Sequence, residues 1–229
     1  MKCLEVKNLN VTLDGEVIIK NLSFNVNKGE VLIIMGPNGA GKTTLLKTLL
    51  DLIPHTGKIK WDAKRISYLP PNEFLQRRRF LPLSIKEFFK LKKAQDEEII
   101  KLLERVGLNK SYLNKSFNKL STGQFQRMLI AWALINNPDV LLFDEPTSGI
   151  DVGGEETIYS LLHEFWKERG ITILLVTHDL NVVWAHANNV LCLNKRGLCY
   201  GHPRKVLTPK NLKELYGTGI KFYKHRRRK

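Results

Sequence analysis

The chain of 229 residues is predicted to adopt an α/β fold, and three observations predict it. Short continuous apolar runs, such as residues 31–35 and 140–143, alternate with segments of helical spacing, which is typical of a parallel sheet with right-handed crossovers. Residues 72–137 contain helical spacing without a strand pattern, which indicates an inserted helical subdomain. The first thirty residues contain short strands separated by Asp14-Gly15 and Lys28-Gly29, which indicate an N-terminal antiparallel β subdomain.

The elements are expected in the following order. Strands are expected at 4–11, 17–20, 22–27, 31–35, 57–61, 66–69, 140–143, 172–176 and 190–193. Helices are expected at 42–52, 85–91, 96–106, 124–135, 155–169 and 180–187. Together they predict a single domain, 1–229, with a core of residues 1–71 and 138–200, a helical subdomain at about 72–137 and a C-terminal segment at 201–229.

Composition and charge restrict the function. Hydrophobic residues make up 43% and charged residues 26%, and no apolar run approaches the roughly 18 residues of a membrane span. The N-terminus has no apolar leader, so a cytoplasmic location is expected. The net charge of +15 is concentrated at 58–93 and 195–229. Two such basic regions suggest an anionic surface, either lipid headgroups or nucleic acid, with a solvated surface and a disordered tail as the alternative.

The three cysteines are too few for a disulfide scaffold. Cys192 and Cys199 flank a tight turn at 194–197, so a hairpin would place them opposite each other. A metal-binding or redox pair is one interpretation. Two small apolar residues in a reducing cytosol are the interpretation that we prefer here.

A glycine-rich turn lies between a predicted strand and a predicted helix and contains the pattern G-x-x-x-x-G-K-[ST]. Its residues, which we call the P-loop, are Gly36, Pro37, Asn38, Gly39, Ala40, Gly41, Lys42, Thr43 and Thr44. Glycines let backbone N–H groups point inward at a triphosphate, and the helix N-terminus adds its positive end. Lys42 is expected to reach the β- and γ-phosphates and Thr43 to bind Mg²⁺, so ATP and Mg²⁺ are the expected cofactors of a P-loop NTPase core.

A second element ends the apolar strand at 140–143 with two carboxylates and a proline, Asp144-Glu145-Pro146. Downstream of a P-loop, Asp144 is expected to hold Mg²⁺, and Glu145 to act as general base on the attacking water.

Between and after these elements lie residues that resemble the ABC ATPases. Residues 120–124 (Leu-Ser-Thr-Gly-Gln) are similar to the family's signature, residues 148–151 to its D-loop, and His178 to its switch histidine. The order and spacing of all five motifs agree over nearly the whole chain. The resemblance implies an ABC ATPase cassette in which Lys42, Glu145 and His178 are catalytic.

By this resemblance two cassettes pair head to tail as a homodimer. The signature residues Ser121, Thr122, Gly123 and Gln124 of one copy would then face the ATP held by the other. Asp151 would link the two sites across the interface. The chain would drive a separate integral membrane permease.

The sequence departs from the family pattern at three places. Pro71 stands where the family has the Q-loop glutamine, with Asn72 or Gln76 as candidate substitutes. Leu13 stands where an aromatic residue stacks on adenine, and an apolar contact from it would still bury the base. Thr122 in place of glycine is a mild change.

Several stretches are similar to the ATPase of bacterial zinc and manganese importers. They are residues 66–71, 81–85, 151–154 and 190–194, with Gly201 and Pro203 beyond. This implies import of a divalent metal ion from an extracytoplasmic binding protein, with the chain peripheral on the cytoplasmic face of the membrane and its basic regions near that surface. The alternatives are an ABC ATPase for another solute, such as an iron chelate, lipid or drug, or a nucleic-acid-linked ABC ATPase, for which 229 residues leave no room for a second cassette.

Overall fold

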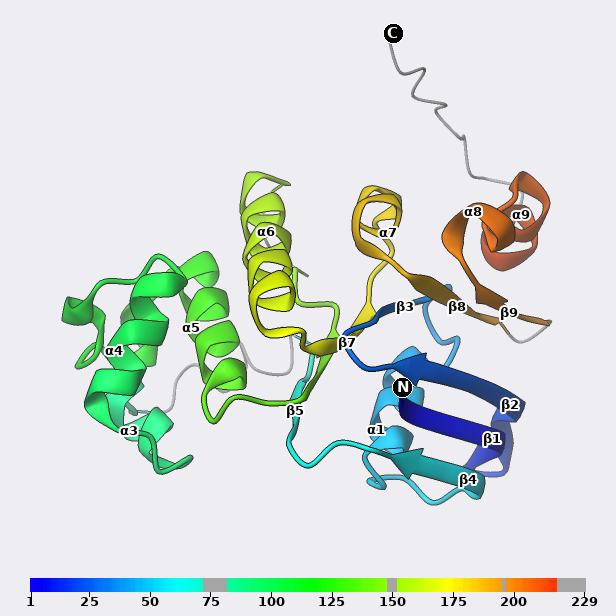
Figure 1. Cartoon of the computed structure of the whole chain (residues 1–229), viewed down its shortest axis with the longest axis horizontal. Helices are drawn as coiled ribbons and strands as arrows, with labels where there is room; N and C mark the ends of the chain where they lie inside the picture. Colours follow the sequence, from blue (N-terminus) through cyan, green and yellow to red (C-terminus); the bar gives the residue numbers. More distant parts are fainter. Residues whose placement is uncertain (72–81, 148–151, 195–196, 218–229) are drawn as a thin grey trace, which may run out of the picture.

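The fold contains two sheets and a group of helices (Figure 1). The computed structural model describes residues 1–71, 82–147, 152–194 and 197–217, without the side chains of residues 152–157 and 197–198. The strands are β1 (Lys2–Leu13), β2 (Glu16–Asn27), β3 (Val31–Met35), β4 (Thr56–Trp61), β5 (Ile66–Leu69), β6 (Val140–Asp144), β7 (Thr172–Val176), β8 (Asn189–Asn194) and β9 (Gly197–Gly201). The helices are α1 (Lys42–Leu49), α3 (Ile85–Lys90), α4 (Asp96–Arg105), α5 (Thr122–Leu134), α6 (Val152–Arg169), α7 (Leu180–His186), α8 (Pro203–Val206) and α9 (Pro209–Tyr216), with short 3₁₀ turns at Lys110–Tyr112 and Phe117–Lys119.

The larger sheet has the order β5-β6-β7-β3-β8-β9. All neighbouring pairs in it are parallel except β8 and β9. Every residue of β3, β6 and β7 is buried, because both faces of the sheet are covered. This confirms the predicted α/β class.

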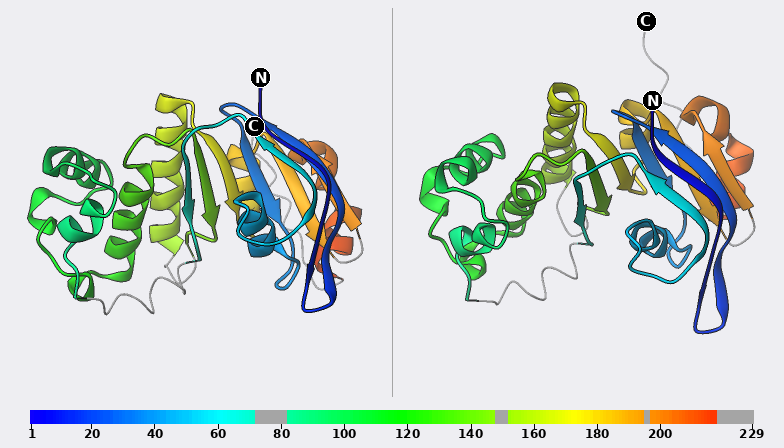
Figure 2. Two further views of the ribbon diagram at one scale, coloured as in Figure 1. Left: turned by 90° about the horizontal axis from the view of Figure 1, so that it is seen from below. Right: turned by 60° about the horizontal axis from the view of Figure 1, so that its bottom comes forward.

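Alternate residues of β3 enter different cores, as a period of two requires. Ile33 and Met35 pack in the core beneath α5, α6 and α7. Leu32 and Ile34 pack in the core formed with α1 and the smaller sheet. Figure 2 shows α1 and the N-terminal strands on one side of the central strands, and the group α3–α5 at the far end of the molecule.

The smaller sheet is antiparallel, with the order β2-β1-β4. The predicted break between strands at 17–20 and 22–27 is wrong, because β2 is continuous. Its pairing with β1 shifts between Leu9↔Leu22 and Val11↔Ile19. Asn21 takes a left-handed φ of 50° there, and its N–H donates to Asn10 Oδ1 at 2.8 Å. A β-bulge therefore occupies the position at which the sequence suggested a chain break.

The helical subdomain is inserted between β5 and β6, which are neighbours in the sheet. Helices α3 and α5 each begin with a capping box, in which Ser84 pairs with Glu87 and Ser121 with Gln124. The reciprocal bonds satisfy N–H groups that the first turn leaves without partners. Helix α5 therefore begins at Thr122, two residues before the predicted start.

Lys92 carries a half-buried charge in this subdomain. Its Nζ lies 3.7 Å from the centroid of the Trp132 ring and donates to the Trp132 carbonyl at 2.8 Å. Burial lowers the pKa of Lys92 from 10.5 to about 8.

The lowered pKa of Lys92 predicts a pH dependence of stability. The unfolded chain binds more protons than the folded chain between pH 8 and 10.5, so the free energy of unfolding rises with pH across that window. Lys92→Met lacks this titration. Between pH 7 and pH 10 the free energy of unfolding of the wild type should therefore rise by about 1 kcal/mol more than that of the variant. This figure is discounted for the partial exposure of Lys92. Urea unfolding at both pH values measures it, and an equal pH response of the two proteins would contradict the assignment.

The C-terminal part adds β9, α8 and α9 to the predicted elements. Cys192 and Cys199 are direct partners in the β8–β9 hairpin, with Cα atoms 4.8 Å apart, as the hairpin predicted. A disulfide joins them, so the expectation of two apolar side chains with free thiols is wrong at this pair. Cys3 is a free, buried thiol. None of the described helices is both long and apolar enough to cross a bilayer.

Candidate active site

The P-loop joins the carboxyl end of β3 to the start of α1, at the edge of the parallel sheet where ligands of α/β folds bind. Two of its glycines are required by space as well as by backbone angle. A Cβ on Gly36 (φ 155°) would lie 2.2 Å from the carbonyl oxygen of Leu193, and one on Gly41 (φ 90°) would lie 2.8 Å from Cγ2 of Ile18. The loop is therefore held between β8 and the β1–β2 hairpin, and no larger side chain fits at these two positions.

Lys42 places a buried positive charge beside the P-loop. Its Nζ donates to the carbonyls of Gly36 (3.0 Å) and Pro37 (3.1 Å) and lies 3.6 Å from Glu145 Oε1. Helix α1 starts at Lys42, with Gly41 as its N-cap, no side-chain cap and no acidic residue in its first turn. The first N–H groups of α1 are thus available to an anion at the positive end of the helix dipole.

Thr43 and Asp144 bring oxygen atoms together next to the loop. Asp144 ends β6 and is only 2% exposed. Burial raises its pKa, and a hydrogen bond from the Thr43 side chain opposes that shift. Tyr68 on β5 also donates to Asp144 Oδ2, at 3.5 Å, and burial beside this carboxyl raises the pKa of the phenol. The structure therefore joins the two residues predicted to hold Mg²⁺.

Glu145 has an unusual backbone conformation, with a φ of 50° in the left-handed region. Its N–H donates to the carbonyl of Val176 at the end of β7, at 3.1 Å. A non-glycine residue in this region costs on the order of 1 kcal/mol and is concentrated at functional sites. The strained turn directs the partly exposed carboxylate toward Lys42.

Tyr159 on α6 connects two loops of the site and was not found from the sequence. Its hydroxyl lies 3.1 Å from Thr147 Oγ1, after β6, and 3.0 Å from Thr177 Oγ1, after β7. Thr177 also accepts a bond from the N–H of Asp179, the N-cap of α7. These bonds fix the turn that carries the exposed His178.

Tyr159→Phe is expected to lower the ATPase kcat about tenfold while leaving the KM for ATP nearly unchanged. It removes the hydroxyl that couples Thr147 to Thr177 without removing the ring. The leftover buried threonine hydroxyls should also lower the free energy of unfolding by about 1–3 kcal/mol. Steady-state kinetics and urea unfolding measure the two effects. An equal change of kcat in the control Tyr200→Phe, whose hydroxyl on β9 donates to the carbonyl of Asn25, would contradict a specific role for Tyr159.

The signature residues lie at the start of α5. The Ser121 Oγ accepts from the Gln124 N–H at 3.2 Å, the Gln124 side chain donates to Tyr112 at 3.0 Å, and Ser121 is exposed. A Cβ on Gly123 would have open space around it. Figure 1 shows α5 among the helices at one end and α1 beside β4 at the other, so the chain does not bring its own signature to its own P-loop.

The remaining predicted residues are less informative. Pro71 follows β5 and is half-buried, whereas Asn72, Gln76 and the D-loop with Asp151 lie outside the described residues. Leu13 ends β1 at the hairpin turn and is partly buried. The hairpin residue found against the P-loop is Ile18, five positions along.

Tyr216 at the end of α9 reaches the back of the P-loop. Its hydroxyl is buried beside the Gly36 backbone, without a hydrogen bond of good geometry, and burial and the charge of Glu145 raise its pKa. The Asn194 side chain donates to the carbonyl of Glu214 at 2.7 Å and holds the end of α9 against β8. No local pattern distinguishes this tyrosine in the sequence.

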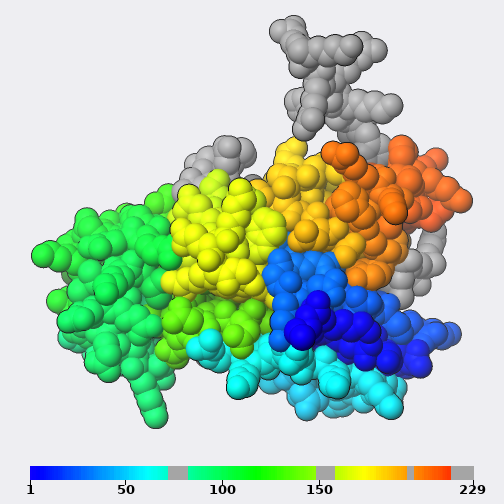
Figure 3. Space-filling view, in the orientation of Figure 1, coloured from blue at the N-terminus to red at the C-terminus, as the bar shows by residue number. Residues whose placement is uncertain are grey.

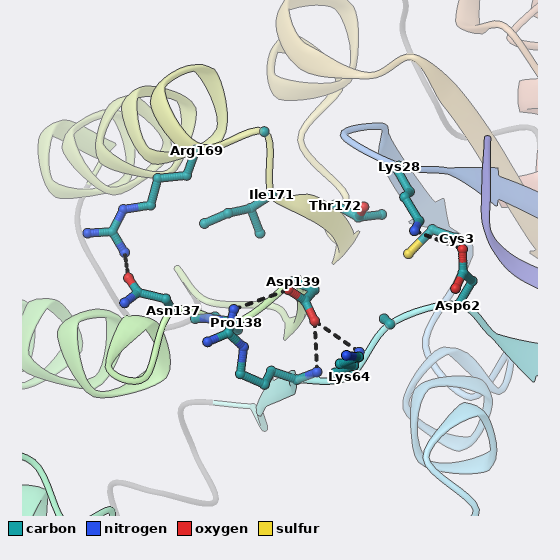
Figure 4. Close-up of a pocket in the computed structure, with 13 residues that line it drawn as sticks. Cys3, Lys28, Asp62, Lys64, Asn137, Pro138, Asp139, Arg169, Ile171 and Thr172 are labelled. Atoms are coloured by element: carbon teal, nitrogen blue, oxygen red, sulfur yellow. Dashed lines mark hydrogen bonds and ion pairs between the residues drawn. The ribbon is translucent and has the colours of Figure 1, made fainter.

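A cavity of about 720 Å³ lies at the opposite edge of the sheet (Figure 4). Asp139 and Thr172, at the amino ends of β6 and β7, help to line it. Both of its carboxylates already have partners: Asp62 pairs with Lys28 at 2.7 Å, and Asp139 accepts from two backbone N–H groups at 2.9 Å each. In Figure 3 the surfaces of the helical subdomain (green) and of the N-terminal strands (blue) lie on either side of α6 (yellow). The cavity therefore belongs to the structural support and not to the P-loop site.

The phosphate-binding loop after β3, its lysine and the carboxylates at the end of β6 define a P-loop nucleotide-binding protein. The family model described as ABC transporter matches residues 19–148. The zinc import ATP-binding protein ZnuC of Buchnera aphidicola subsp. Schizaphis graminum is 38% identical over 224 residues, 96% of this chain and 92% of the relative. A metal transport system ATP-binding protein of Thermotoga maritima is also 38% identical, over 94% of this chain and 91% of the relative.

Among solved structures, a metal-chelate type ABC transporter in an inward-facing conformation superimposes with a TM-score of 0.82. It is 30% identical and covers 94% of this chain and 89% of its own. This chain belongs to the ABC transporter family as an ATP-binding cassette with ATPase activity.

Proposed function

We propose that this chain powers the import of a divalent metal ion, zinc or manganese, through a separate membrane permease. The observation that carries the proposal is the 38% identity, over nearly the whole chain, to proteins named for zinc import and metal transport. The P-loop, the carboxylates at the end of β6 and the signature supply the parts of an ATP-driven cycle.

The P-loop and Lys42 bind the triphosphate of ATP. The N–H groups at the start of α1 are uncapped, and Lys42 is held beside the loop by two carbonyl oxygens. ATP would draw the ammonium from these carbonyls and from Glu145 to its phosphates. We assign the adenine to the β1–β2 hairpin, where the partly buried Leu13 and Ile18 offer apolar contact and Val17 is 56% exposed.

Mg²⁺ suits the oxygen atoms beside the loop. Asp144 and Thr43 are hydrogen-bonded, close to the P-loop, and both supply the hard oxygen ligands that Mg²⁺ prefers. We assign these two residues to the ion. When bound, Mg²⁺ neutralises phosphate charge and orients the phosphates.

Glu145 is the general base and His178 positions the γ-phosphate. The left-handed turn holds the Glu145 carboxylate near Lys42, and departure of the Lys42 ammonium to ATP frees it to accept a proton from water. The hydrogen bonds of Tyr159 with Thr147 and Thr177 stabilise the turn that carries His178.

A second copy of the chain completes the site. Ser121 is exposed and Gly123 has open space beside its Cα at the positive end of α5, which suits them to face the γ-phosphate of a partner cassette. Gln124 and Thr122 support that end of the helix. We assign Asp151 to contacts across the same interface.

A second candidate cargo is a metal chelate. The 30% identity to the metal-chelate type transporter favours it over a lipid or a drug. Both cargoes place the chain on the cytoplasmic face of a membrane, with the permease as partner, an extracytoplasmic binding protein as donor of the cargo and the basic regions near anionic lipid. Neither uses nucleic acid.

The metal content of cells tests the cargo. Cells that carry Glu145→Gln in place of the wild type are grown with scarce metal, and their zinc, manganese and iron are measured. A selective fall in zinc or manganese, reversed by adding that metal, is the expected result. A fall in iron alone would favour the chelate, and unchanged metals with a demonstrably inactive ATPase would overturn the proposal.

A further inference from the structure

Two histidines on different helices lie in direct contact away from the P-loop. His163 is on α6 and His186 ends α7, and their Nδ1 atoms are 3.1 Å apart, with ring centroids separated by 4.5 Å. Both side chains are half-buried, and the His163 ring also packs 5.1 Å from the ring of Trp166. Neither histidine takes part in the site described above.

The spacing of the two nitrogens matches that of two ligands on one metal ion. Zinc–imidazole bonds of about 2.0–2.1 Å at a tetrahedral angle place the two nitrogens about 3.3 Å apart, within a few tenths of an ångström of the observed separation. In the absence of metal, one Nδ1 must carry the proton that the other accepts. Binding through both Nδ1 atoms therefore needs the proton on one Nδ1 to move to Nε2 of the same ring, and a tilt of the rings that turns both lone pairs toward the ion.

The residues around His163 and His186 favour the neutral form of both imidazoles, and a small cavity lies beside the two rings. Burial lowers the pKa of both imidazoles, and Lys167 acts in the same direction on each. A cavity of about 20 Å³ lies alongside, with room for one water-sized occupant; both histidines and Tyr159 line it, and its other lining residues are apolar or aromatic, such as Leu162 and Val182. The neighbouring acidic group, Glu164, acts on His163 through its charge and is exposed.

We propose that His163 and His186 form a two-histidine site for a first-row transition-metal ion that prefers imidazole, such as Zn²⁺ or Ni²⁺, with water completing the coordination. Among the described residues no group of three or more His, Cys, Asp or Glu is placed to hold a metal, so water must supply the other ligands. Imidazole nitrogen separates this site chemically from the oxygen ligands of Thr43 and Asp144, which suit Mg²⁺. The site does not depend on which cargo the transporter carries.

The proposed ion joins two helices that start at the catalytic loops. Helix α6 follows the D-loop, and α7 follows His178. Tyr159, one turn before His163 on α6, is hydrogen-bonded to Thr177. An ion between His163 and His186 would therefore stabilise the packing of α6 on α7 just behind the site.

Thermal unfolding and metal binding test the site on the purified full chain without nucleotide. NiCl₂ or ZnCl₂ is expected to raise the Tm of the wild type and of the control His55→Gln, whose ring lies on the other side of the molecule beside Asp51. His163→Gln and His186→Gln should lose that shift and one metal equivalent in equilibrium dialysis, whereas MgCl₂ should not distinguish the four proteins. Equal Ni²⁺ and Zn²⁺ binding by the wild type and both variants would overturn the proposal.

A second measurement uses the wild type alone, so that its result does not depend on whether the histidine variants fold. The electron paramagnetic resonance spectrum of one equivalent of Cu²⁺ should show hyperfine coupling to two imidazole nitrogens, and Zn²⁺ should displace that signal. A spectrum with oxygen ligands only would reject the two-histidine site.

Discussion

Glu145→Gln is expected to lower ATP hydrolysis by 10²- to 10⁴-fold while ATP binding is retained, since a general base contributes about that factor. The amide keeps the size of the side chain, but it cannot accept the proton of the attacking water. It also loses the negative charge 3.6 Å from Lys42, so the ammonium is freer to hold phosphate. ATP and Mg²⁺ should therefore trap a closed dimer, seen as an earlier peak in gel filtration, whereas hydrolysis is followed by phosphate release.

A carboxylate far from the loop provides the control for this variant. Glu97 is exposed in the first turn of α4, and Glu97→Gln should hydrolyse ATP at the wild-type rate and elute as the wild type does. Normal turnover by Glu145→Gln would show that another group is the base. Loss of turnover without a dimer would retain the base and reject the trans arrangement of the signature.

Gly36→Ala is expected to lower the free energy of unfolding by on the order of 3 kcal/mol or more, even without nucleotide, because backbone is the obstacle. The new Cβ would lie 2.2 Å from the carbonyl oxygen of Leu193, so β8 or the loop must move. Urea unfolding of the two proteins measures the loss. ATP affinity should fall with it, because the loop can no longer hold its N–H groups together.

Gly39→Ala is the matched control within the same loop. Its φ of 76° is unfavourable for alanine, but nothing lies within 4 Å of the added Cβ, so a loss of only about 1 kcal/mol is expected. If both alanine variants lose the same free energy, backbone angle alone explains the glycines and the contact with Leu193 is unimportant.

The patterns of the candidate site are visible in the sequence, because single segments encode them. The apolar run of β3, the P-loop and the two carboxylates at the end of β6 are contiguous, and in the structure the Thr43 side chain is hydrogen-bonded to Asp144. The start of α5 at Thr122 was not predicted, but the capping-box spacing of Ser121 and Gln124 could have indicated it. The continuity of β2 was missed because a strand break and a bulge both use a polar residue such as Asn21.

The tyrosine contacts that support the loops of the site could not be predicted from single segments of the sequence. Tyr159 reaches Thr147 and Thr177 from one face of α6, and Tyr216 reaches Gly36 from a helix 180 residues later in the chain. Each depends on the packing of elements distant in sequence, and a single aromatic residue on a helix has no pattern of its own. The pair His163 and His186 became visible for the same reason only in three dimensions.

The position of Tyr216 has a consequence for how the two ends of the molecule communicate. We expect the docking of α9 and the affinity of the loop for nucleotide to be linked equilibria, because the Tyr216 hydroxyl at the end of α9 is buried beside the Gly36 backbone. Such linkage is reciprocal. If bound nucleotide changes the equilibrium constant for docking of α9 by some factor, docking of α9 changes the affinity for nucleotide by the same factor, and a molecule that detaches α9 reverses that change. A fusion placed after α9 is therefore expected to change ATP affinity through that helix, without contact with the site.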